Sequence, residues 1–215
     1  MSVLASLDWP TVASLATAAG TLVLAIATFA SVRSANRSAR LAELALQEQR
    51  RPVLVQSRLD DPLQKIMFVD GHWVRVGGSG AVAEHLDGIV YLAVSLRNVG
   101  AGLGVLQGWH VRPGLRTSRD GHADESEFRA QSRDLYIPPG DVGLWQGALR
   151  DPTEEVHPAI AEAAQRREVM SLDLLYTDQV GGQRTISHFS LVPVGDDSWT
   201  VSVGRHWYLD RDGPR

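Results

Sequence analysis

Residues 77–81, GGSGA, come close to the G-x-S-x-G turn that presents the nucleophile of α/β hydrolases, with Ala81 at the last position. Ser79 would be the nucleophile, and His85 and Asp87 follow close behind it. That turn needs a strand before it, a full helix after it and a parallel sheet. Too few residues follow for a helix, so we interpret 77–81 as a loop between a hairpin and a strand. The same glycines lack the Lys-Ser/Thr pair of a phosphate-binding loop.

The seven histidines show no spacing typical of metal ligands, such as H-x-x-x-H or H-x-H. Folding could bring His110, His188 and His206 together, since all three lie on or just beyond predicted strands, although scattered surface histidines are the simpler interpretation. The chain has no cysteine, which excludes disulfides, thiolate metal sites and a cysteine nucleophile. We therefore predict no catalytic, cofactor-binding or metal-binding residue.

Aromatic residues gather in the second half of the chain, and Trp207 and Tyr208 end its last predicted strand. Core packing is the usual role of a tryptophan in a β domain. Trp207 and Tyr208 could instead line a surface for a partner protein, because such residues dominate binding hot spots. The sequence leaves open which of the two roles they take.

Residues 11–32 indicate the cellular location of any such surface, because these 22 residues contain no charge. As a helix they extend ~33 Å, enough to cross a hydrocarbon layer of ~30 Å. A cleaved signal peptide would have a basic start and a shorter apolar core. A buried soluble helix would show a polar stripe. We therefore predict a transmembrane helix that follows a short N-terminal segment, residues 1–10.

The charges that flank this helix predict its orientation. Arg33, Arg37 and Arg40 follow the apolar residues, whereas the N-terminal segment offers only Asp8. The positive-inside rule then places the N-terminus outside and the remaining chain in the cytoplasm, as a single-pass protein of the cell membrane. The three arginines share one helix face near the lipid surface, where they could bind anionic head groups or simply set the topology.

Two features favour self-association. Ala16 and Gly20 form a small-xxx-small pair, which lets two membrane helices approach closely. Residues 33–51 form a basic stalk of strong helix formers that should continue the membrane helix, and their apolar positions make a short coiled-coil-like seam. The chain could therefore form a homo-oligomer through the transmembrane helix or the stalk. Packing of the stalk on its own domain is the alternative, and Pro52 stops the helix.

From residue 52 to residue 215 the apolar pattern alternates, which predicts a mainly β domain. Asp70 and Gly71 lie between two alternating runs and predict a two-residue type I′ hairpin within residues 66–76. Residues 113–134 are polar and aperiodic and predict a long mobile loop, and a helix should cover about 153–167. Some eight or nine strands with one inserted helix predict an antiparallel, immunoglobulin-like β-sandwich.

The charge distribution argues against a nucleic-acid partner. The chain carries −4 overall; residues 1–32 carry −1, and residues 33–51 carry five Arg against two Glu, or +3. By difference the β domain carries −6, whereas nucleic-acid binding needs a basic surface to neutralise phosphates.

The segments RPVLV (51–55) and YLAVSLRNVGAGLGV (91–105), which includes LRNVGAG (96–102), follow the span and the stalk. In this arrangement the chain resembles uncharacterised bacterial single-pass membrane proteins with a basic helical stalk and a small β-sandwich whose central strand ends in an N-x-G-x-G turn. The resemblance covers about the first half of the chain and implies no catalytic residues. Similar sequences often place Pro-Ala where this chain has Leu103 and Gly104.

These features predict a membrane-anchored protein that presents a cytoplasmic β-sandwich as a protein-interaction or assembly module, with the lipid bilayer and a protein of unknown identity as partners. One alternative is a membrane-tethered, hydrolase-like enzyme whose site is assembled from distant strands. Another is an envelope-binding module outside the cytoplasm.

Overall fold

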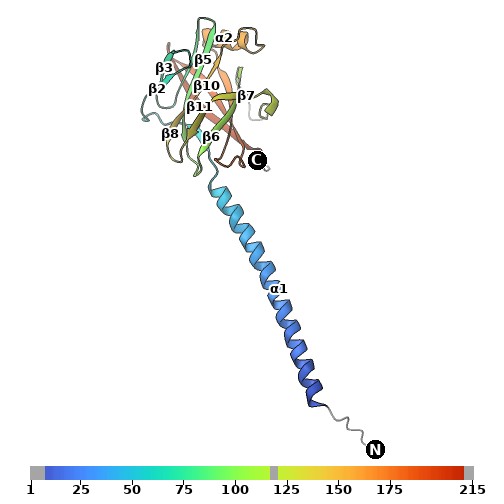
Figure 1. Ribbon diagram of the computed structural model, residues 1–215. Helices are drawn as coiled ribbons and strands as arrows, with labels where there is room; N and C mark the ends of the chain where they lie inside the picture. Colours follow the sequence, from blue (N-terminus) through green and yellow to red (C-terminus); the bar gives the residue numbers. More distant parts are fainter. Residues whose placement is uncertain (1–7, 117–120, 211–215) are drawn as a thin grey trace, which may run out of the picture. The chain divides into compact units, whose positions relative to one another are not determined.

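The computed structural model describes residues 8–116 and 121–210 and divides the chain into two compact units, Met1–Glu48 and Gln49–Arg215. The first unit is helical. The second is mainly β, as predicted, and is built from antiparallel strands with one α-helix (Figure 1).

Helix α1 (Trp9–Gln49) is continuous over 41 residues, so the apolar segment and the stalk form one helix (Figure 1). Its length and composition suit a membrane-spanning helix, with a mean hydropathy of 1.9 in its most apolar window and none of that window buried. The hydroxyls of Ser14, Thr17 and Thr21 donate to main-chain carbonyls three or four residues earlier. Their polar atoms are thereby satisfied within the helix, as a lipid environment requires.

Nine strands form one curled antiparallel sheet. They are β1 (Leu54–Gln56), β4 (Gly80–Leu86), β5 (Ile89–Asn98), β6 (Gly104–Pro113), β7 (Arg129–Ile137), β8 (Val142–Leu149), β9 (Met170–Thr177), β10 (Thr185–Val194) and β11 (Ser198–Tyr208). Their order is β1-β5-β4-β11-β10-β9-β6-β7, and β8 also pairs with β5. Residues 90–94 of β5 pair with both β4 and β8, so β8 occupies the edge opposite β4.

The curl brings the two ends of the sheet together. Gln131 of β7 donates to the carbonyl of Gln146 on β8 (3.1 Å) and accepts a hydrogen bond from the indole of Trp145 (3.2 Å). Helix α2 (His157–Arg166) packs Ile160 and three alanines into the main core that the sheet encloses. All nine strands belong to one sheet, and the predicted immunoglobulin-like sandwich remains a prediction.

A separate hairpin, β2 (Gln64–Met67) and β3 (Trp73–Val76), covers a second, smaller core. Its turn differs from the predicted two-residue form. The amide of Phe68 donates to His72 O and the amide of Gly71 to Phe68 O, and Gly71 has φ +84°. The loop therefore has three residues, a type I turn followed by a glycine in the left-handed region.

Two other segments differ from the sequence expectation. The expected loop 113–134 contains a 3₁₀ turn at Glu125–Glu127, capped by Asp124, and β7 begins at Arg129. The first part of β7 is mostly exposed, so it lacks the apolar alternation by which strands are recognised. Helix α2 begins at His157 rather than near 153, because Asp151 accepts hydrogen bonds from Thr153 and holds that segment in a turn.

Candidate functional site

The structure does not assemble the residues of the hydrolase-like motif. Ser79 precedes β4, whereas His85 lies near the far end of that strand and Asp87 just beyond it. Six residues of extended chain separate Ser79 from His85 by ~20 Å. The backbone of Ser79 is itself engaged: its amide donates to Ser57 Oγ (2.8 Å) and its carbonyl accepts from Val201 N. These residues join β4 to its neighbours.

Two of the three strand histidines do converge, on a carboxylate that the sequence analysis did not single out. His110 of β6 and His188 of β10 both lie in register with Asp173 of β9. Asp173 Oδ1 lies 2.6 Å from His188 Nδ1, and both side chains are buried. The third histidine, His206, is in register with Ser187 and contacts it instead.

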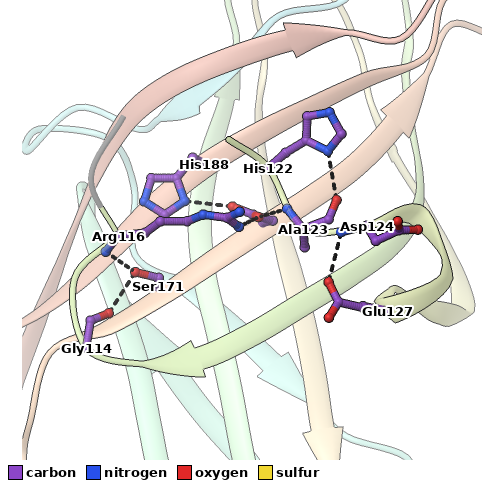
Figure 2. A network of polar contacts seen from close by, with 9 residues as sticks. Gly114, Arg116, His122, Ala123, Asp124, Glu127, Ser171 and His188 are labelled. Atoms are coloured by element: carbon purple, nitrogen blue, oxygen red, sulfur yellow. Dashed lines mark hydrogen bonds and ion pairs between the residues drawn. The ribbon is translucent and has the colours of Figure 1, made fainter. Parts of the chain in front are cut away.

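Asp173 also fixes the loop that contains Arg116 and Ala123, both labelled in Figure 2. Its Oδ2 accepts from Arg116 Nη1 (2.9 Å) and from the amide of Ala123 (3.1 Å). Ser171, two residues earlier on β9, accepts from the amide of Arg116 and donates to the carbonyl of Gly114. We call Asp173, His188, Arg116 and Ser171 the loop latch, because these side chains hold the segment that follows β6.

Opposing effects act on the Asp173 carboxylate. Burial alone would raise its pKa, but hydrogen bonds from His188 and Ala123, with the nearby charge of Arg116, lower its pKa overall. Asp173 is therefore ionised at neutral pH and accepts three hydrogen bonds. Since Asp173 engages Nδ1 of His188, Nε2 is the remaining polar atom of that ring. It is buried and has no hydrogen-bond partner among the described residues.

An aspartate–histidine pair orients the base in many hydrolases, but catalysis also requires a nucleophile at the other ring nitrogen. The neighbours of the His188 ring are Trp207, whose centroid is 6.3 Å away, and Gly204. Within residues 8–116 and 121–210 no hydroxyl is hydrogen-bonded to Nε2, and no group of three acidic or histidine side chains could hold a metal ion. The geometry of the loop latch is thus that of a structural network.

A second polar chain runs along the other face of β10. The amide of Leu54 donates to Tyr176 Oη (3.2 Å), Tyr176 contacts Ser187 Oγ (2.8 Å), and Ser187 contacts His206 Nδ1 (2.6 Å). The Ser187 hydroxyl thus bridges the Tyr176 hydroxyl and the His206 ring. Burial lowers the pKa of His206. Burial also raises the pKa of Tyr176 to about 12.

The predicted partner residues Trp207 and Tyr208 are half-buried and contact the domain itself. The ring of Trp207 lies 5.6 Å from that of His122, while Tyr208 lies under the guanidinium of Arg51 at 4.3 Å. Arg51 also forms an ion pair with Asp210 (2.6 Å). On α1, the predicted lipid and self-association residues are all exposed, and a Cβ at Gly20 would meet nothing; they are Arg33, Arg37, Arg40, Ala16 and Gly20.

The two segments that carry the family resemblance meet at the start of the β domain. Asn98, fully buried, accepts from the amides of Val53 and Gly100 and donates to the carbonyls of Gly102 and Ile137. A Cβ on Gly102 would lie only 1.6 Å from the carbonyl oxygen of Arg50. We call this region the exit clamp, because it fixes the chain immediately after α1 ends.

One surface depression combines exposed aromatic, apolar and basic side chains. It has a volume of about 630 Å³ and lies between the β2–β3 hairpin and strands β7 and β8. We call it the hairpin groove; its lining comprises residues 64–67, Trp73, residues 133–136, residues 142–144 and Gln146. A guanidinium nitrogen of Arg133 lies 3.5 Å from the carbonyl oxygen of Met67, so β7 and the outer edge of β2 face each other across the groove.

The sequence analysis missed Asp173, Asn98 and the hairpin groove. A carboxylate in the apolar strand 168–178 was the available signal for Asp173, since a charge there needs a buried partner. The groove offered no local signal, because it joins segments up to 82 residues apart in sequence. Comparison of this chain with protein-family models, curated proteins and solved structures finds no match.

Proposed function

We propose that this chain is a single-pass membrane protein that presents its β domain at the cytoplasmic face of the cell membrane as a protein-interaction or assembly module. One observation carries the proposal: the apolar surface of α1 is uncovered. Trp9, Leu15 and Phe29 are 82%, 72% and 70% exposed. Exposed apolar area costs about 25 cal/mol per Å² in water. A lipid bilayer would remove that cost, and the helix satisfies its own main-chain hydrogen bonds there.

The charge pattern supports the orientation with the N-terminus outside. Arg33, Arg37 and Arg40 follow the uncharged segment at once and are exposed, as residues at a lipid head-group layer would be. Residues 33–49 continue the helix for ~25 Å beyond the span. The stalk would act as a spacer between lipid and domain, and the Ala16–Gly20 face or the stalk could pair two copies.

Two features of the β domain support a role in interaction. The exit clamp fixes the first residues of the β domain, and the hairpin groove leaves Trp73 and Tyr136 60% and 54% exposed. Exposed aromatic side chains beside a groove are typical of protein-binding surfaces. The immunoglobulin-like sandwich belongs to the same proposal, supported by antiparallel strands that alternate around a shared core.

Cysteine labelling tests the topology cleanly, because the chain has no cysteine of its own. Asp8→Cys precedes the span, and Asp196→Cys lies in the exposed turn between β10 and β11. In intact cells a membrane-impermeant maleimide should label the first variant alone, and the second should react only after permeabilisation. The reverse pattern would place the β domain outside and favour the envelope-binding alternative.

A further inference from the structure

We propose that the hairpin groove binds an extended, acidic segment of a partner protein, which adds to β2 as a new strand. The inference rests on the proposed role as an interaction module and names the class of partner. Strand addition is a recurrent mode of peptide recognition, in which main-chain hydrogen bonds supply affinity and alternate side chains supply specificity.

The hairpin register leaves the main-chain groups of Lys65 and the N–H of Met67 available to such a strand, whereas Met67 O already accepts a hydrogen bond from Arg133 (3.5 Å). Phe68 donates to His72 O, so these two residues form a hydrogen-bonded pair. In an antiparallel ladder such pairs alternate, and Ile66 and Gln64 are the next residues of β2 to bond with β3. Lys65 and Met67 therefore direct their N–H and C=O groups toward the outer edge. The contact between Arg133 and Met67 O confirms that this edge faces the groove.

Gln64 Oε1 is buried and has no hydrogen-bond partner among the described residues, although Gln64 lines the groove. On its outer edge β2 has no ladder partner within the described part of the chain. An added strand would supply N–H and C=O groups at the two-residue spacing that Lys65 and Met67 require.

The exposed face of the hairpin defines the side chains that would fit. Lys65 pairs with Arg75 across the ladder, and Met67 pairs with Trp73. Lys65 and Arg133 line the groove, and Arg75 lies on the same face of the hairpin as Lys65. In the described residues none of these three cations forms an ion pair. Asp134 supplies a single opposing charge.

This basic and apolar surface lies on a domain that carries −6 overall, so the complementary occupant has acidic side chains next to aliphatic ones. A lysine on a sheet edge normally discourages another strand from pairing there. A segment with carboxylates opposite Lys65 is the kind of strand that this edge still admits.

The test uses the full chain in phosphatidylcholine nanodiscs and a phage library of random 12-residue peptides as the probe. The library is counter-selected against Met67→Pro, which removes the outward N–H of β2 but leaves its bonds to β3 intact. Selected peptides should alternate acidic and aliphatic residues. Amide exchange at Lys65 and Met67 should slow at least ~10-fold on binding, because both amides become hydrogen-bonded.

Charge reversal provides a second variant that keeps the hairpin backbone. Lys65→Glu with Arg75→Glu should weaken the selected peptides about 30-fold, because attraction becomes repulsion at two sites. Arg112→Glu, the same change on β6 outside the groove, should weaken them less than ~2-fold.

Three results would overturn the proposal: no peptide selected over the Met67→Pro variant, selected peptides that ignore the Lys65 and Arg75 reversals, or protection at other amides. Binding to phosphatidylglycerol vesicles that is lost with Trp73→Ala would assign the surface to lipid and also overturn it. Membrane extraction and cysteine labelling do not depend on β2. Their failure would contradict the anchoring proposal while leaving peptide binding intact.

Discussion

The side-chain amide of Asn98 donates a hydrogen bond to the carbonyl oxygen of Gly102, 2.6 Å away, and a second to the carbonyl of Ile137 (2.9 Å). Its carbonyl oxygen accepts from the amides of Val53 and Gly100. One buried side chain thereby satisfies the turn after β5, the end of β7 and the first residues after the stalk. The two segments RPVLV and LRNVGAG, 40 residues apart, are one structural unit.

Asn98→Ala should therefore destabilise the β domain by about 4 kcal/mol, because it leaves two part-buried amides and two buried carbonyls without their Asn98 partner. Chemical denaturation of the full chain in detergent, followed by tryptophan fluorescence, measures the change. Asn36→Ala on the exposed face of α1 is the matched control and should leave the midpoint unchanged. Equal midpoints for the two variants would show that Asn98 does not hold the exit clamp.

Gly102→Ala should destabilise the domain by about 2 kcal/mol or more, because the new Cβ would overlap the carbonyl of Arg50 and displace the segment after α1. Gly182→Ala makes the same change where nothing lies within 4 Å of the new Cβ. Its free energy of unfolding should stay within about 0.5 kcal/mol of the parent chain. A tolerated Gly102→Ala would contradict the close approach.

Local sequence patterns predicted the individual strands better than they predicted how the loops close and how the sheet curls. The alternation around Asp70 and Gly71 predicted the hairpin, but not its three-residue loop. Tyr91 and Arg150 hold the Asp70 carboxylate at 2.9 and 3.2 Å, and neither is near the turn in sequence. The curl likewise depends on contacts between β7 and β8, such as Gln131 with Trp145. These contacts form only in the folded domain, so no local pattern in the sequence predicts them.

The candidate sites were less predictable than the fold. Asp173 was visible as a carboxylate in an apolar strand, yet its partners Arg116 and Ala123 lie 57 and 50 residues earlier. Of the three strand histidines, His110 and His188 lie in register with Asp173, whereas His206 lies in register with Ser187. Adjacent positions on β10 face opposite sides of the sheet. His188 therefore meets Asp173 on one side, while Ser187 meets His206 on the other.

Asp173→Asn should cost about 3–5 kcal/mol of stability, because it removes the negative charge that pairs with the buried guanidinium of Arg116 and with His188. The loop latch should loosen at the same time, so trypsin should cleave after Arg116 under conditions that leave the parent chain intact; the bond after Arg112 precedes Pro113 and resists trypsin. Mass spectrometry of the fragments locates the cuts. Asp60→Asn, at an exposed position, is the control; an unchanged digest for Asp173→Asn would refute the latch.

Acid should destabilise the domain through two histidines. Burial lowers the pKa of His206 and also that of His110, where Asp173 and Glu127 partly oppose it. In the unfolded chain both titrate near ~6.5. Below that pH the unfolded state binds more protons than the folded state. The free energy of unfolding therefore decreases as the pH is lowered, until the pH lies below the pKa values of the two histidines in the folded state. Above about pH 7.5 it should be flat.

His206→Asn tests the origin of this pH dependence. The asparagine amide can still hydrogen-bond to Ser187 but cannot be protonated, so the free energy of unfolding should change less steeply between pH 5 and 6.5. The double variant with His110→Asn should be flatter still. A slope that neither change alters would assign the acid sensitivity to other groups.

Alkaline carbonate extraction of whole-cell membranes tests the membrane anchor most directly. The parent chain should remain in the membrane pellet. Leu22→Arg with Leu24→Arg should release it, because each charge costs about 2.5–3.5 kcal/mol at the centre of a span. Leu41→Arg with Leu44→Arg, the same change on exposed leucines of the stalk, should stay in the pellet. Release of the parent chain into the soluble fraction would contradict the anchor.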